Sequence, residues 1–113
     1  MGRRAVGTPA FRGQIWLADA GVGEAKRFVI VSNNQRNERL ADVLGARLTT
    51  APKPSIPSVA EFAAGEISES ASRVVADDIV PIKKRFLIRQ DGALTSGQMR
   101  RVEDALRNAL ALG

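Results

Sequence analysis

Short apolar runs alternate with polar breaks along most of the chain, a pattern typical of a protein built mainly from short strands. The run 27–31 is rich in β-branched and aromatic residues and predicts a buried strand. Similar but shorter runs predict further strands at 14–18, 43–50, 58–62, 73–77 and 86–88. Gly45 is expected to kink the predicted strand at 43–50.

The polar breaks between these runs carry turn and loop signals. Residues 19–26 contain two glycines and predict a turn or loop, and 35–42 predicts a short polar helix or turn. Three prolines within 51–57 make that segment a rigid loop, because proline neither donates to a ladder nor continues a helix. We expect Pro81 to turn the chain that follows it into an edge or a bend.

The clearest local signal lies at the C-terminus. Thr95 and Gln98 have the spacing of a capping box, in which each side chain satisfies a backbone N–H of the other's residue. Apolar residues then recur at helical spacing, namely Met99, Val102, Leu106 and Leu110. The sequence therefore predicts a small, strongly bent β-sheet or barrel, spanning residues 12–113 and packed against one amphipathic helix. Residues 1–11 read as a flexible, basic N-terminal arm.

The composition of the 113-residue chain restricts its chemistry, because it has no cysteine and no histidine. Disulfides, zinc sites built on these residues and histidine-activated nucleophiles are excluded. No apolar run is long enough for a membrane span, so we expect a cytoplasmic protein with no membrane partner. Catalysis, if present, depends on arginine, lysine, carboxylates or hydroxyl groups.

The charge is basic and unevenly distributed. The net charge is +5, and 13 of the 17 basic residues are arginine, whose planar guanidinium pairs well with phosphate. Residues 1–40 carry seven basic and three acidic groups, and residues 81–113 also carry seven basic and three acidic groups. The segment 55–80 between them is acidic, with one basic and five acidic groups. Two basic stretches suit a polyanionic partner, although ordinary solubility charge explains the composition equally well.

Several segments, taken in order, resemble the PemK/MazF-type toxins of bacterial toxin–antitoxin pairs. RGQIW at 12–16 is similar to that family's RGEIW opening, and RFVIVSNN at 27–34 to its RPVLVVSND segment. LTT at 48–50, VVADDI at 74–79 and the helical segment 94–112 also resemble family segments. The family has Gln and Arg where this chain has Asp78 and Val80, which leaves base preference open.

The resemblance implies an SH3-like, strongly twisted small β-barrel with a C-terminal amphipathic helix, acting as a homodimer. It also implies a sequence-specific endoribonuclease that cuts single-stranded RNA without metal or cofactor. The RNA 2′-hydroxyl attacks the adjacent phosphate and leaves 2′,3′-cyclic phosphate and 5′-hydroxyl ends. The family's functional arginine and threonine match Arg27 and Thr49. The predicted RNA-binding residues are Lys26, Asn33, Asn34, Thr50, Lys53 and Asp78. The implied protein partner is a cognate antitoxin with an acidic, disordered tail.

Other readings of these residues stay open at this point. Taken alone, Arg27 is an ordinary surface arginine beside a strand, and Thr49 suits a strand by propensity. Trp16 fits a core position better than a platform for base stacking. The alternative functions are a non-enzymatic gyrase poison of the CcdB type and an RNA-binding barrel that has lost cleavage.

Overall fold

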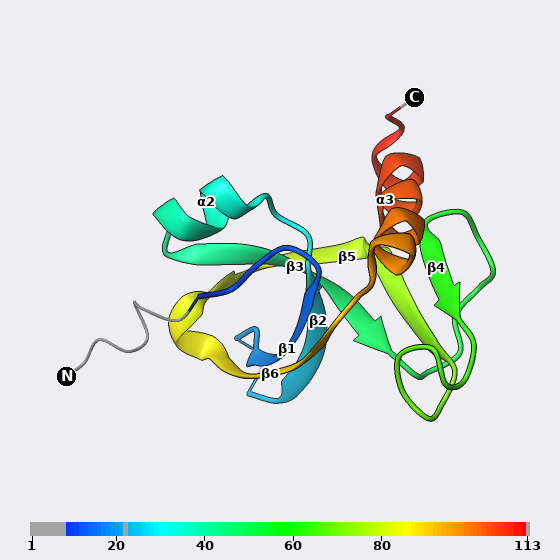
Figure 1. The fold of residues 1–113 in the computed structure, drawn as a ribbon, viewed down its shortest axis with the longest axis horizontal. Coiled ribbons are helices and arrows are strands. Elements are labelled where there is room, and N and C mark those ends of the chain that lie inside the picture. Colours follow the sequence, from blue (N-terminus) through cyan, green and yellow to red (C-terminus); the bar gives the residue numbers. More distant parts are fainter. Residues whose placement is uncertain (1–8, 22, 113) are drawn as a thin grey trace.

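One antiparallel sheet of six strands forms the centre of the molecule, in the order β4-β5-β3-β2-β1-β6 (Figure 1). The structure is a computed structural model that describes residues 9–21 and 23–112. The strands are β1 (Gln14–Asp19), β2 (Ala25–Ile30), β3 (Asp42–Thr49), β4 (Val59–Phe62), β5 (Ser72–Lys83) and β6 (Leu87–Ala93). The helices are α2 (Asn34–Arg39), the single 3-10 turn η1 (Lys84–Phe86) and α3 (Ser96–Leu110).

The predicted fold class is confirmed: the protein is mainly β and ends in an amphipathic helix, which lies beside β4 and one end of β5 (Figure 1). Thr95 and Gln98 form the predicted capping box at the start of α3. The boundaries differ by a few residues. In particular, α2 ends at Arg39 and β3 already begins at Asp42, so the predicted helix at 35–42 is too long at its C-terminal end. Most of the predicted N-terminal arm, residues 1–8, lies outside the described residues, and Ala10 at its end is buried.

Strand β5 is longer than the sequence predicts, because it continues through Pro81 to Lys83. Pro81 pairs with Leu44 of β3. The backbone N–H of Leu44 donates to Ser32 Oγ and its carbonyl accepts from Val31, so neither group points toward β5. The N–H that proline lacks is therefore not needed at this position. On its other side β5 pairs with β4 only over Ser72–Val75, so Pro81 does lie on an edge.

Both faces of the strongly twisted sheet are buried over part of their area. Beneath α3, the apolar residues of one face pack with three residues of the helix, giving the cluster Ile15, Val29, Ala46, Leu48, Ala60, Phe62, Val74, Ala76, Met99, Val102 and Ala105. The alternate positions form a second cluster of Ala10, Trp16, Ala18, Phe28, Ile30, Val43 and Ile82. This explains the continuous apolar run of β2, whose successive side chains point into different cores. Trp16 is accordingly a core residue.

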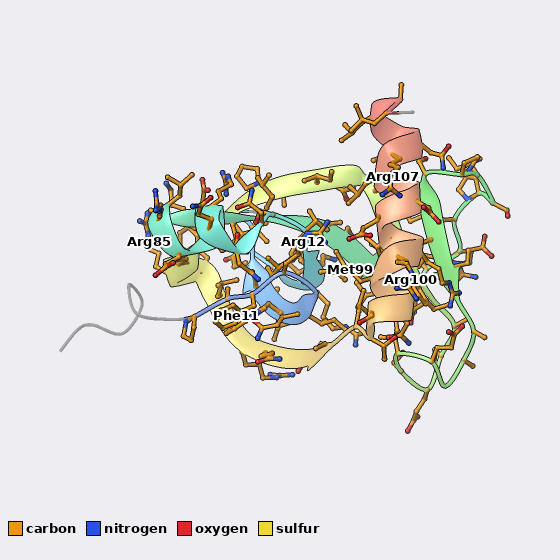
Figure 2. The ribbon with its side chains drawn as sticks, turned by 45° about the horizontal axis from the view of Figure 1, so that its top comes forward. Phe11, Arg12, Arg85, Met99, Arg100 and Arg107 are labelled. Carbon is orange, nitrogen blue, oxygen red and sulfur yellow. The ribbon has the colours of Figure 1, made fainter. Side chains whose placement is uncertain are left out.

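Arg12, just before β1, links the sheet to the C-terminal helix by a hydrogen bond and an ion pair. Its Nε donates to the carbonyl of Val31 at 3.0 Å, and its guanidinium forms a 2.7 Å ion pair with Glu103 of α3. Figure 2 shows Arg12 between the strands and α3, whereas Arg85 lies at the end of the molecule far from the helix. The helix is thus held both by apolar packing and by a partly buried ion pair.

Candidate functional site

A depression of about 420 Å³ lies where β2 begins and β3 ends. Four of its lining side chains are cations, one is a carboxylate, and the others are small, apolar or hydroxyl-bearing. The lining residues are Leu17, Ala25, Lys26, Arg27, Arg47, Leu48, Thr49, Thr50, Arg89 and Asp91. We call this site the cationic depression.

Strand pairing explains why residues distant in the sequence meet here. Arg27 is the partner of Leu48 on one side and of Leu17 on the other. Leu17 in turn pairs with Arg89 of β6. Directly opposed residues project from the same face of a sheet, so the side chains of Arg89, Leu17 and Arg27 form a row across three strands. Thr49 follows the partner of Arg27 and projects from the opposite face of β3. It lines the same depression because β3 ends at Thr49, beside the start of β2.

Arg27 and Thr49, the predicted catalytic pair, both line this depression, and both side chains are half-buried. The Thr49 Oγ1 accepts a hydrogen bond from the backbone N–H of Ala51 at 3.0 Å. Among the described residues this hydroxyl donates no hydrogen bond, so its proton is available to a ligand. Within the described part of the chain, Arg27 has no ion-pair partner. The depression thus offers a guanidinium and a hydroxyl as donors.

Two ion pairs at the depression's rim limit its positive charge. Lys26 pairs with Glu24 at 2.8 Å, and Arg89 pairs with Asp91 at 2.9 Å. The hydrogen bond and the charge of Lys26 lower the pKa of Glu24, and the charge of Arg47 contributes to the same shift. Glu24 is therefore ionised at neutral pH beside these two cations. With four cations against Asp91 among its lining residues, the depression favours an anionic ligand.

The other predicted RNA-binding residues divide into two groups. Lys26 and Thr50 line the cationic depression with Arg27 and Thr49. Asn33, Asn34, Lys53 and Asp78 do not, and their role in RNA binding stays a prediction.

Asn33 and Asn34 stabilise the fold. The Asn33 side chain caps α2 by accepting from the backbone N–H of Arg36 at 2.8 Å. Asn34 Oδ1 accepts from the backbone N–H of Arg12 at 2.7 Å.

Asp78 lies in an irregular part of β5. The pairing partner in β5 changes from Ile79, opposite Ala46, to Val75, opposite Arg47. Residues 76–78 therefore have no partner in β3, and Asp78 is exposed there. Asp77 accepts a 2.5 Å hydrogen bond from Ser58 Oγ, so the two aspartates have different surroundings. Among the described residues, no three or more acidic side chains gather where a metal ion could be held.

Arg47 and Arg89 line the cationic depression, although neither was predicted from the sequence as a site residue. Arg47 could have been found, because it lies two positions before Thr49 in a predicted strand and must share its face. Arg89 could not, because its place depends on the long-range pairing of β6 with β1.

A second depression, of about 410 Å³, lies beside α3 and is mostly apolar. It is lined by Arg12, Val31, Leu44, Ile79, Glu103, Leu106, Arg107, Leu110 and Leu112. The Arg12–Glu103 ion pair neutralises two of its three charged residues. Leu110 and Leu112 are 56% and 61% exposed, which is unusual for two neighbouring leucines. We call this site the apolar depression.

The fold agrees with what comparisons with known proteins show. Residues 11–110 match the model of the PemK-like, MazF-like toxins of type II toxin–antitoxin systems. The chain belongs to this family.

Individual relatives point the same way. The chain is 40% identical over 101 residues to a protein of Mycobacterium bovis named Endoribonuclease MazF1, covering 89% of this chain and 92% of that protein. It is equally similar to Endoribonuclease MazF4 of Mycobacterium tuberculosis. A mycobacterial endoribonuclease solved in complex with its cognate antitoxin has a TM-score of 0.81 and 36% identity, covering 92% of this chain and 97% of that one. In the described part of this chain, the helices are too short or too polar to cross a membrane.

Proposed function

We propose that this protein is the toxin of a type II toxin–antitoxin pair and a sequence-specific, metal-independent endoribonuclease acting on single-stranded RNA. The observation that carries this proposal is that Arg27 and Thr49 line one depression together with three further cations. The names of the mycobacterial relatives support the same activity. Cleavage of cellular RNA would stop translation and growth, and the protein would work in the cytoplasm.

The proposed reaction uses the RNA's own nucleophile. The 2′-hydroxyl oxygen loses its proton as it forms a bond to the adjacent phosphorus. The bond from phosphorus to the 5′-oxygen of the next nucleotide breaks, and that oxygen takes up a proton, so the reaction has no net change in protons. The products carry a 2′,3′-cyclic phosphate and a 5′-hydroxyl. Negative charge grows on the phosphate oxygens as the bond forms, and Arg27 and Thr49 donate hydrogen bonds to them. Arg27 acts first as an electrostatic stabiliser and second as a proton donor, because a guanidinium is a poor base at neutral pH.

We further propose that the protein is inhibited by a cognate antitoxin with an acidic, disordered tail. The net charge of +5 and the cations of the cationic depression would attract such a tail. A mycobacterial relative was solved with its own antitoxin, which supports a partner of this type.

The proposed homodimer has its best support in the apolar depression. Leu106, Leu110 and Leu112 line a surface that water solvates poorly, next to the partly buried Val31 and Leu44. Covering this surface with a second copy would bury the exposed leucines and add hydrophobic stabilisation of about 25 cal/mol per Å² of apolar area.

The test is to incubate a long mixed-sequence RNA with the pure protein in excess EDTA and to map the ends produced. We expect discrete fragments with 5′-hydroxyl ends from the wild type and from the control Arg100→Ala. Arg100 is exposed on α3 and lies outside the depression (Figure 2). Arg27→Ala and Thr49→Ala are expected to stop cleavage while they keep the wild-type melting temperature.

Two results would overturn the proposal in favour of the alternatives. Intact RNA together with growth arrest and inhibition of DNA gyrase would identify a gyrase poison. Tight RNA binding by the wild type without any cut would identify an RNA-binding protein that has lost cleavage.

A further inference from the structure

Arg47 is a partly buried arginine in the middle of the sheet that forms no ion pair with the residues the structure describes. It lies on β3 between Phe28 of β2 and Val75 of β5. Its Nε is shielded from solvent and has no hydrogen-bond partner among the described residues, and none of the ion pairs found there includes it. A shielded donor without a partner costs free energy, so an arginine in this state suits a site whose acceptor arrives with a ligand.

The position of Arg47 relative to Thr49 fixes where such an acceptor would be. Side chains two residues apart on a strand project from the same face, and their Cα atoms are about 7 Å apart. This is close to the separation of successive phosphates along an extended single strand of RNA. Both side chains line the cationic depression.

Of the other three cations of the depression, Arg27 is already assigned to the phosphate that is cut, and the remaining two have ion-pair partners. Arg89 is held by Asp91, and Lys26 by Glu24. Arg73 shares with Arg47 a shielded Nε without a partner, but its terminal nitrogen donates to the carbonyl of Thr50 at 3.2 Å and it does not line the depression. Arg47 therefore combines a place in the depression with a shielded Nε–H that none of the described residues accepts.

We infer that Arg47 binds the phosphodiester next to the one held by Thr49, so that the site grips two successive phosphates of the RNA. This inference rests on the proposed function, because Thr49 is assigned there to the phosphate that is cut. It assigns Arg47 a role in positioning: the neighbouring phosphate fixes the register in which the chain lies across Arg27 and Thr49. A guanidinium suits this task because its fork holds two phosphate oxygens at once.

The first experiment measures binding without cleavage. A labelled single-stranded RNA oligonucleotide with 2′-O-methyl groups throughout lacks the nucleophile, so its affinity for the full chain can be followed over a range of salt concentrations. Each phosphate contact contributes about 0.7 to the slope of log K against log salt for a single strand. We expect Arg47→Gln to weaken binding about tenfold at low salt and to lower that slope by about 0.7. Arg100→Gln is the matched control and is expected to keep the wild-type slope.

The second experiment keeps the wild-type protein and changes the RNA, so it does not depend on the folding of a variant. Single phosphates are replaced one at a time by neutral methylphosphonates. We expect one replacement, directly adjacent to the cleaved position, to weaken wild-type binding about as much as Arg47→Gln does. Binding by Arg47→Gln itself is expected to be insensitive to that replacement, because the two changes remove the same contact.

The outcomes separate this inference from the proposed function. Cleavage by the wild type, with an unchanged salt slope in Arg47→Gln, overturns the inference and leaves the proposed function intact. An equal loss in Arg100→Gln also overturns it, because the effect is then one of overall charge. A lowered slope in a protein that binds RNA but never cuts it overturns the proposed function and leaves Arg47 as a phosphate ligand.

Discussion

The cationic and apolar depressions have nearly the same volume, about 420 and 410 Å³, and lie near opposite ends of the β2–β3 pair. At one end of the β2–β3 pair Arg27 is opposite Leu48, and at the other end the backbone N–H of Val31 donates to the carbonyl of Leu44. The first end carries four cations, whereas the second carries aliphatic side chains and a neutralised ion pair. The volume of a depression therefore indicates little about the partner that it binds, whereas the chemistry of its lining residues indicates the class of partner.

The largest effect is expected from a change confined to the cationic depression. Arg27→Lys keeps the positive charge but loses the planar fork that holds two phosphate oxygens. Removal of one preorganised donor commonly costs 10²–10³-fold in rate, and we expect a loss of about this size. Single-turnover cleavage of a defined RNA measures it, with the melting temperature and the oligomeric state as controls. Activity within twofold of the wild type would show that charge alone suffices.

The next effect concerns the strand that both depressions share. Gly45 lies within β3, and a Cβ added there would come within 2.7 Å of Ile82 Cδ1 and 2.9 Å of Phe28 Cβ. The Phe28 Cβ belongs to a fully packed core and has no room to retreat. We expect Gly45→Ala to lower the free energy of unfolding by about 1–3 kcal/mol, as measured by urea denaturation. An unchanged midpoint would mean that the sheet adjusts more easily than its packing indicates.

The third effect is expected to be confined to the apolar depression. Leu110 is exposed in one copy of the chain, so Leu110→Asp costs the isolated fold little. In a dimer that covers this surface, the carboxylate would be buried without a partner. We therefore expect the dissociation constant of the dimer to rise at least about tenfold, as measured by sedimentation equilibrium. A dimer of unchanged affinity would remove the apolar depression from the proposed interface.

Features that depend on a local sequence pattern could be predicted from the sequence, whereas features that depend on long-range pairing could not. The helix α3 and the strands are local patterns, so Thr95 with Gln98 and the run at β2 predicted them well. Arg89 lies in the cationic depression because β6 pairs with β1, and no local pattern encodes that pairing.

Asn34 was predicted to bind RNA, but it does not line the cationic depression. Its side-chain oxygen accepts a hydrogen bond from the backbone N–H of Arg12, a long-range contact that no local pattern encodes. The family resemblance predicted Arg27 and Thr49 as the functional pair, and this stays a prediction. Arg47 lies outside the segments 27–34 and 48–50 that resemble the family, so the resemblance gave no indication of it.

The smallest effect tests whether the helix beside the apolar depression also depends on charge. Arg101 of α3 forms a 2.8 Å ion pair with Glu66, in the loop between β4 and β5. The hydrogen bond from Arg101 lowers the pKa of Glu66, and the backbone N–H of Ala63 adds to the shift. Because the pKa is lower in the folded than in the unfolded chain, the ionised carboxylate stabilises the fold above the unfolded pKa. That contribution is lost as the pH falls through the lowered value.

Glu66→Gln should therefore melt slightly below the wild type at pH 7, by a small margin because the pair is exposed to solvent. The two melting curves are expected to converge once the pH has fallen through the lowered pKa of Glu66, because the wild-type carboxylate is then protonated as well. Thermal melts of both proteins across this pH range, at low and high salt, measure the difference. A gap that persists at low pH would assign the effect to packing of the loop against α3 and not to the charge of Glu66.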